Sequence, residues 1–117
     1  MNSSEIHVIE KPSIDISIND ISLDNYNIYR SFAPFGESWK APLLRINHIK
    51  VDALLYSKTG EHIMTKIGNN SKLVGFNISR ESLYRVPFID IEGYLDTSSF
   101  RNLATTEFHI SNFYKVN

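Results

Sequence analysis

The sequence contains no cysteine, only one tryptophan and no long apolar run. Without cysteine the chain can form neither disulfides nor a thiolate metal site, which is typical of a reducing compartment. A membrane-spanning helix needs a run of about 18 or more apolar residues, and none occurs. The N-terminal stretch MNSSEIHVIEK lacks the basic start and apolar core of a secretion signal. These absences predict a cytoplasmic protein that does not contact membranes.

Signatures of catalysis are also missing from the sequence. It has no glycine-rich phosphate loop and no Gly-x-Ser-x-Gly elbow, and no histidine has an acid or a second histidine at zinc-ligand spacing. We therefore expect no metal or other cofactor, and we expect that the chain is not an enzyme by itself. Each histidine is interpreted as a polar residue on the wet face of a strand: His7, His48, His62 and His109.

The length of the chain limits the size of its core, and its charge distribution limits the kind of partner it can bind. With 117 residues, 42% of them hydrophobic, the chain can build one modest core. Residues 1–37 carry six acids against two bases, whereas residues 38–117 carry ten bases against seven acids. The second part could therefore meet a polyanion, although many solvated β surfaces carry a similar excess.

The N-terminal part predicts one strand, one helix and a rigid joint. Apolar and polar residues alternate over 13–18, the period of a half-buried strand. Asp20 or Ser22 could then cap a helix that runs to about Phe32 and stops at Pro34. The joint that follows holds two prolines, a glycine and the tryptophan. We place a domain boundary after it, between an N-terminal segment (1–42) and a β domain (43–117).

Nearly everything after the joint has the pattern of β-strands. The first apolar run is too long for one flat strand, so it is expected to bend near its middle. Gly75 predicts a bulge or a close backbone approach, and Ser79 could cap a single helical turn before Pro87. The five expected strands span residues 43–57, 62–67, 73–78, 88–96 and 105–115.

Five strands with a short helix between the third and the fourth have the element order of an OB-fold, a small Greek-key barrel. The predicted class is therefore mainly β, with a closed five-stranded barrel. Five strands alone would also fit an SH3-like barrel, and only the short helix separates the two.

The joint FAPFGESWKAPLLR resembles the segment that leads into the C-terminal OB domain of the RecJ family of single-strand DNA exonucleases. The resemblance extends from about residue 13 to residue 114. IDISINDISL is similar to the strand that finishes the family's nuclease core, LVGFNIS to a later strand, and GYLDTSSFRNLATTEFHISNF to the last hairpin. The matching residues are Ala33, Pro34, Phe35, Gly36, Glu37, Pro42, Gly75, Phe76, Asn77, Gly93, Leu95, Phe100, Glu107, Phe108 and Ile110, with Asn112 in place of the family's usual Asp.

Two kinds of departure accompany this resemblance. Ser38, Trp39 and Lys40 replace Gly-Asn-Pro in the joint, and Asn102 replaces the hairpin glycine. The metal-binding aspartates and Asp-His-His motif with which RecJ nucleases cut DNA are missing. The resemblance thus implies a non-catalytic domain that grips single-stranded DNA for a nuclease core which this chain does not contain, in DNA repair and recombination.

Binding to single-stranded DNA would need exposed rings for base stacking and cations for the phosphates. Tyr56 with Lys58, and Phe100 with Arg101, pair a ring with a cation near a loop tip. If Ile63, Thr65 and Ile67 face inward, Lys66 faces out. Phe76 is expected in the core, with a stacking platform as the alternative. The candidate DNA-binding residues are Tyr56, Lys58, Lys66, Lys72, Phe76, Phe100 and Arg101, and a micromolar affinity is expected.

A competing hypothesis is a protein-docking module attached to a nuclease core or to a replication or repair protein. Asp90, Glu92 and Tyr94 would share a wet, negative face that DNA avoids, and Trp39 would contact a protein that the family does not meet there. A small-ligand carrier has less support, because no convergent set of polar groups is visible. The strand at 13–18 would also expose an edge, which predicts self-association.

Overall fold

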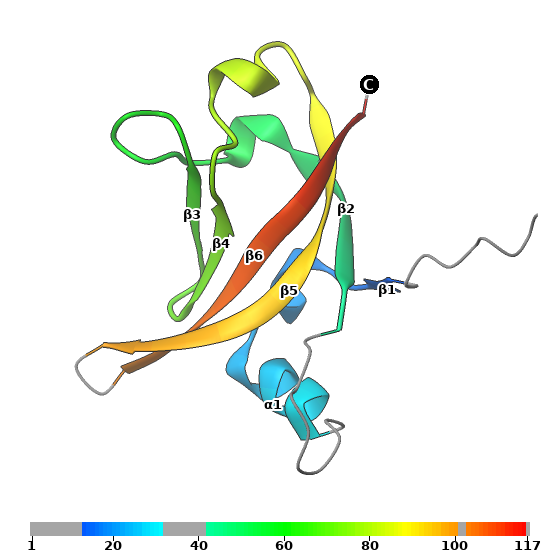
Figure 1. The fold of residues 1–117 in the computed structure, drawn as a ribbon, viewed down its shortest axis with the longest axis vertical. Coiled ribbons are helices and arrows are strands. Elements are labelled where there is room, and N and C mark those ends of the chain that lie inside the picture. The colour runs from blue at the N-terminus through cyan, green and yellow to red at the C-terminus, as the bar shows by residue number, and fades with distance from the viewer. Residues whose placement is uncertain (1–12, 32–41, 101–102, 117) are drawn as a thin grey trace, which may run out of the picture.

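The structure is a computed structural model that describes residues 13–31, 42–100 and 103–116. Within these ranges the protein is mainly β, as predicted, with one α-helix and a single mixed sheet (Figure 1). The sheet has six strands in the order β1-β2-β5-β6-β4-β3. Their bounds are β1 Ile14–Asp15, β2 Leu44–Lys50, β3 Ile63–Ile67, β4 Ser71–Gly75, β5 Phe88–Phe100 and β6 Leu103–Val116.

The expected bend in the first long run is confirmed. β2 ends at Lys50, and the 3₁₀ helix η3 (Val51–Ala53) redirects the chain. The residues beyond η3 then lie beside β3, where Tyr56 forms an isolated bridge with Ile63. The Thr65 hydroxyl supports this contact, because it accepts the N–H of Leu55 at 3.0 Å and donates to the carbonyl of the same residue at 3.2 Å.

The detail of a closed five-stranded barrel is not confirmed. The sheet has a sixth strand, β1, which pairs in parallel with β2 at Ile14–Leu44 and Asp15–Arg45. At the other edge, β3 bonds to the segment after η3 through one isolated bridge and a few hydrogen bonds of Leu55 and Ser57, without a continuous strand pairing, so the sheet is curled without being closed into a barrel. The third predicted strand, 73–78, is β4 at Ser71–Gly75, and it stops where Asn77 adopts a positive φ of 62°.

Two bulges keep apolar residues inside along β5, the central strand. In β2, buried Ile46 and Ile49 are three residues apart but face Ile91 and Ile89, because the register shifts around His48. In β6, Ile110 pairs with Gly93 and Asn112 with Glu92, so Ser111 is the extra residue and Phe113 returns to the core side. Because each inserted residue reverses the alternation of sides, both neighbours of β5 continue to present apolar side chains to the core.

The N-terminal segment is only partly as predicted. The strand covers two residues rather than 13–18, because Ser17 and Asp20 form a capping box that begins the 3₁₀ helix η2 (Ile18–Asp20). The predicted helix is confirmed as α1 (Leu23–Ser31), and the Ser22 hydroxyl accepts the N–H of Asn25 as its cap. Pro34 and the rest of the joint up to residue 41 lie outside the described residues.

The two ends of the curled sheet are covered by different elements. The 3₁₀ helix η4 (Glu81–Leu83) lies between β4 and β5 at one end, with Leu83 buried in the core, and α1 lies at the other end (Figure 1). The Ser79 hydroxyl accepts the N–H of Ser82, the bond expected of the predicted cap, but Arg80 rather than Ser79 occupies the N-cap position of η4. Ile21 belongs to the same core as the strands. The proposed boundary after residue 42 stays a prediction.

The helices of the described segments are all too short or too polar to cross a lipid bilayer.

The bulge in β6 requires glycine at position 93. A Cβ on Gly93 would collide with the carbonyl oxygen of His109 and with the ring of Phe108. At Gly75, where a bulge or a close backbone approach was expected, the pairing with β3 is regular and the near atoms belong to side chains: a Cβ there would lie 2.9 Å from Ile78 Cδ1. At Gly93 the obstacle is backbone, which cannot rotate away.

We predict that Gly93→Ala lowers the free energy of unfolding by about 3 kcal/mol, because the new methyl group must push β5 away from β6. The measurement is chemical denaturation. Gly68→Ala is the matched control: its φ is 60° but nothing lies within 4 Å of the added Cβ, so about 1 kcal/mol is expected. Equal losses in the two variants would contradict the tight approach at Gly93.

Candidate nucleic-acid interface

The outer face of the sheet is defined by the residues that alternate with the core. Ile63 and Thr65 are buried, as predicted, while Met64 and Lys66 are exposed. Residues that pair across strands lie on the same face. The register therefore places two rows side by side across β3, β4, β6 and β5: Met64, Val74, His109 and Tyr94 in one, and Lys66, Lys72, Glu107 and Asp96 in the other.

An aromatic row crosses this outer face. The Phe76 ring lies edge-on to His62, with centroids 5.7 Å apart, and 6.2 Å from the ring of His109. His109 in turn stacks on Tyr94 at 5.4 Å with an interplanar angle of 11°. Phe76 is 60% exposed and Tyr94 is 39% exposed. We call these four residues, His62, Phe76, His109 and Tyr94, the ring row.

The preferred placement of Phe76 in the core was wrong, and the alternative, an exposed ring, is what the structure shows. Leu73 and Gly75 take the inward positions of β4, and Ile78 fills the core beyond the strand. Phe76 follows Gly75 and therefore points outward. Val74 also lies on the outer face but is buried, so apolar side chains cover both faces of this strand.

Two lysines lie beside the ring row. Lys66 and Lys72 are direct cross-strand partners, an arrangement in which like charges repel. Lys72 also has Glu107 as its partner in β6, but the two oxygens of Glu107 are bound by His109 at 2.9 Å and by Ser98 at 3.3 Å. Within the described ranges neither lysine forms a salt bridge. Their charges are therefore available to an anion on the outer face.

Tyr56 and Lys58, predicted to act together, lie in different environments. Tyr56 is half-buried against the core, and the Arg80 guanidinium lies 5.1 Å from its ring centroid. Burial raises the pKa of the Tyr56 phenol, and the charge of Arg80 partly offsets the rise, so the phenol is protonated at neutral pH. The core and the Arg80 guanidinium thus already contact the ring of Tyr56, so base stacking on this ring has little support.

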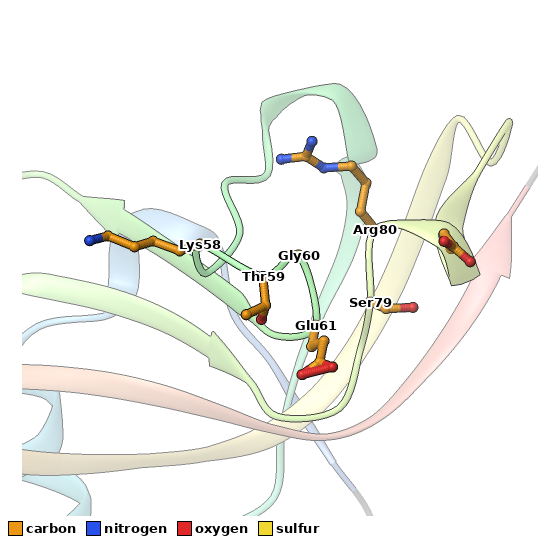
Figure 2. Close-up of a pocket in the computed structure, with 7 residues that line it drawn as sticks. Lys58, Thr59, Gly60, Glu61, Ser79 and Arg80 are labelled. Carbon is orange, nitrogen blue, oxygen red and sulfur yellow. The ribbon is translucent and has the colours of Figure 1, made fainter.

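Lys58 lines a pocket of about 460 Å³ between the loop before β3 and the residues that lead into η4. Its other lining residues include Glu61, Arg80 and Glu81, so acids and bases are mixed. Figure 2 shows that Lys58 and Arg80 extend in different directions and do not converge on one point. The pocket is therefore a poor site for a single anion, and Lys58 is better placed for a loose phosphate contact.

Three predicted residues cannot be placed. Trp39 and Arg101 lie outside the described residues. The backbone of Phe100 pairs with Leu103 at the end of the β5–β6 hairpin, but its side chain is not among those described. Figure 1 shows this hairpin reaching beyond the rest of the sheet. The roles assigned to these three residues stay predictions.

Two acids of β5, Asp90 and Glu92, are held in a salt-bridged network. Ile89, Ile91 and Leu95 point inward, as expected, and Asp90 and Glu92 face outward. Arg45 binds both, at 3.2 Å to Asp90 and 3.1 Å to Glu92, and its guanidinium lies 5.2 Å from the Tyr114 ring centroid. Partial burial alone would lower the pKa of Arg45, but the hydrogen bonds to Glu92 and Asp90 raise it above its ordinary value.

Three members of the ring row were not among the candidates. His62 and His109 were interpreted as ordinary wet-face residues, and Tyr94 was grouped with Asp90 and Glu92. The register instead pairs Tyr94 with His109, on the other side of the bulge from Glu92. Alternation within each strand correctly predicted that these side chains face outward. Only the order of the strands in the sheet brings their rings together.

Within the parts of the chain that the structure describes, no group of three or more histidine, cysteine, aspartate or glutamate residues could hold a metal ion.

Strand order, the helical turn before β5 and the exposed ring row together define an OB-type domain. Residues 13–112 match the family model described as the RecJ OB domain, and the chain belongs to this family. A crystal structure of RecJ from Thermus thermophilus in complex with Mn²⁺ has a similar fold, with a TM-score of 0.50 and 15% sequence identity. The similarity covers 72% of this chain and 12% of that one. A search of curated proteins finds no match.

We predict that Arg45→Ala lowers the free energy of unfolding by about 1–2 kcal/mol, because it leaves two partly buried carboxylates facing each other without a cation. Thermal and chemical denaturation measure the loss. Lys66→Ala is the control, since this exposed lysine forms no salt bridge in the described segments. It should change stability by less than about 0.5 kcal/mol. Equal effects would show that the Arg45 network contributes nothing.

Proposed function

We propose that this domain binds single-stranded DNA on the outer face of β3, β4, β6 and β5, and that it grips substrate for a RecJ-like exonuclease core outside this chain. The ring row beside Lys66 and Lys72 is the observation that carries the proposal. Proteins that bind single strands without strong sequence preference combine stacking rings with cations that follow the backbone. OB-folds use the face of their second and third strands for this purpose, which correspond here to β3 and β4.

The ring row and the lysine pair match the two parts of a nucleotide that a protein can bind, the base and the phosphate. Phe76 and Tyr94 have exposed faces for bases, and the lysine pair lies in the neighbouring row, where phosphates would pass. A phosphate between Lys66 and Lys72 would relieve the repulsion of the pair. Acids at the far end of the lysine row, Asp96 and Glu107, would keep the phosphates on the β3–β4 side. Two rings with a few cations support a micromolar affinity.

The catalytic step is assigned to a separate core. The family to which the chain belongs is an OB domain, and the similarity covers only a small share of the RecJ chain from Thermus thermophilus. We also propose a role in DNA repair and recombination, which the likeness to RecJ nucleases implies. In that role the domain adds affinity for the strand that the nuclease core consumes.

The docking hypothesis has less support at the residues first chosen for it. Arg45 binds both Asp90 and Glu92, so only one of their two negative charges is left unmatched for a basic partner. Among the described strands, β1 is paired on one side only, and Ile14 is exposed, which keeps self-association as a prediction. Size-exclusion chromatography at high concentration tests it, and an elution volume of a monomer would count against it.

The wild-type domain should bind a labelled oligothymidine with micromolar affinity that falls steeply as salt rises, because each neutralised phosphate releases counterions. Lys66→Glu and Lys72→Glu should each weaken binding about tenfold or more at low salt. Lys50→Glu, an exposed change of the same charge on β2, should have a smaller effect. Fluorescence anisotropy at two salt concentrations measures this. If the three variants bind alike, the lysine pair does not contact DNA.

Removing the Phe76 ring should cost about 1–3 kcal/mol of binding free energy, the contribution of one stacked base. Tyr84→Ala is a matched control, because Tyr84 is 73% exposed but lies beyond η4, outside the ring row. Both proteins should unfold at nearly the wild-type temperature, since each loses an exposed ring. An affinity of Phe76→Ala equal to that of Tyr84→Ala would place the DNA elsewhere.

A further inference from the structure

His62 has a contact that the binding face alone does not explain. Its Nδ1 accepts the backbone N–H of Asn77 at 2.8 Å. Asn77 lies directly after Phe76, at the end of β4, and has a φ of 62°. In this left-handed conformation the peptide N–H has left the ladder of the sheet, and His62 supplies its acceptor.

His62 is itself fixed from the opposite side. Its backbone carbonyl accepts the N–H of Ser57 at 2.9 Å, and its backbone N–H donates to the Ser57 hydroxyl at 3.3 Å. The imidazole therefore connects the loop before β3 to the turn after β4. Because Nδ1 is the acceptor, the neutral ring carries its proton on Nε2.

The same imidazole contacts the ring of Phe76 edge-on. Without the bond to Asn77, a 60% exposed phenylalanine at the end of a strand would have, among the described rings, only His109, at 6.2 Å, as a neighbour. Exposed side chains exchange rotamers readily, so a ring that must stack on a base needs a support that limits this motion.

We propose that His62 is a positioning residue that fixes the exposed ring of Phe76 for base stacking, through its Nδ1 bond to Asn77 and its edge contact with the ring. This inference rests on the proposed function and deepens it. His62 then raises affinity without contacting DNA, because the cost of ordering Phe76 is met before the strand binds.

Two substitutions at position 62 distinguish the hydrogen bond between Nδ1 and Asn77 from the other contacts of the side chain. His62→Asn places an amide oxygen near the position of Nδ1, so it keeps the acceptor for Asn77. His62→Gln places its oxygen one bond farther out, near the position of Nε2, and loses that acceptor. We expect His62→Gln to weaken oligothymidine binding about fivefold and His62→Asn to recover most of this loss, with melting temperatures of both close to the wild type.

A double-mutant cycle with Phe76→Ala completes the test. If His62 acts through Phe76, His62→Gln adds no further loss of affinity once the ring is removed. If His62 contacts DNA directly, the two losses multiply and His62→Asn fails to recover affinity, which would overturn the inference. A wild-type domain that does not bind at all would refute the proposed function instead, and a Phe76→Ala effect without any His62→Gln effect would refute only the role of His62.

Discussion

The structure depends on how β5 is paired on both sides. Its inward residues, Ile89, Ile91 and Leu95, build the centre of the core, and its neighbours β2 and β6 must each present apolar side chains to the same side. Both neighbours do so only by inserting one extra residue, around His48 in β2 and at Ser111 in β6. Gly93 permits the second insertion, because its missing Cβ leaves room for the backbone of β6.

The same pairing determines which side chains lie on the outer face of the sheet. On one side of the bulge at Gly93, Arg45 forms salt bridges with both Asp90 and Glu92. On the other side, Tyr94 faces His109 and continues the ring row toward Phe76, at the end of β4. One register shift thus separates a salt-bridged charged area from a face with exposed rings and a repelling lysine pair. The proposed function belongs to the second area, where neither lysine forms a salt bridge within the described segments.

Sequence reasoning predicted those features that depend on neighbours in the chain. The period of apolar residues gave the strands and the faces of Met64 and Lys66, and cap chemistry at Ser22 and Ser79 gave α1 and the turn before β5. It failed at two local features and wherever distant segments decide the outcome. The capping box of Ser17 and Asp20 shortened β1, and Phe76, on the face opposite Gly75, was assigned to the core because phenylalanine is usually buried. His62, Tyr94 and His109 come from three separate segments of the chain, so no local pattern could have joined them to Phe76.

The central claim is that unpaired DNA lies across β3, β4, β6 and β5. Chemical-shift changes of the backbone amides on addition of oligothymidine test it most directly, because they report the contacted face without any substitution. The account predicts that the largest changes fall at Lys66, Lys72, Phe76, Tyr94 and His109, while the amides of α1 and β1 stay unchanged. Changes concentrated around Arg45 and Asp90, or none at millimolar DNA, would contradict it.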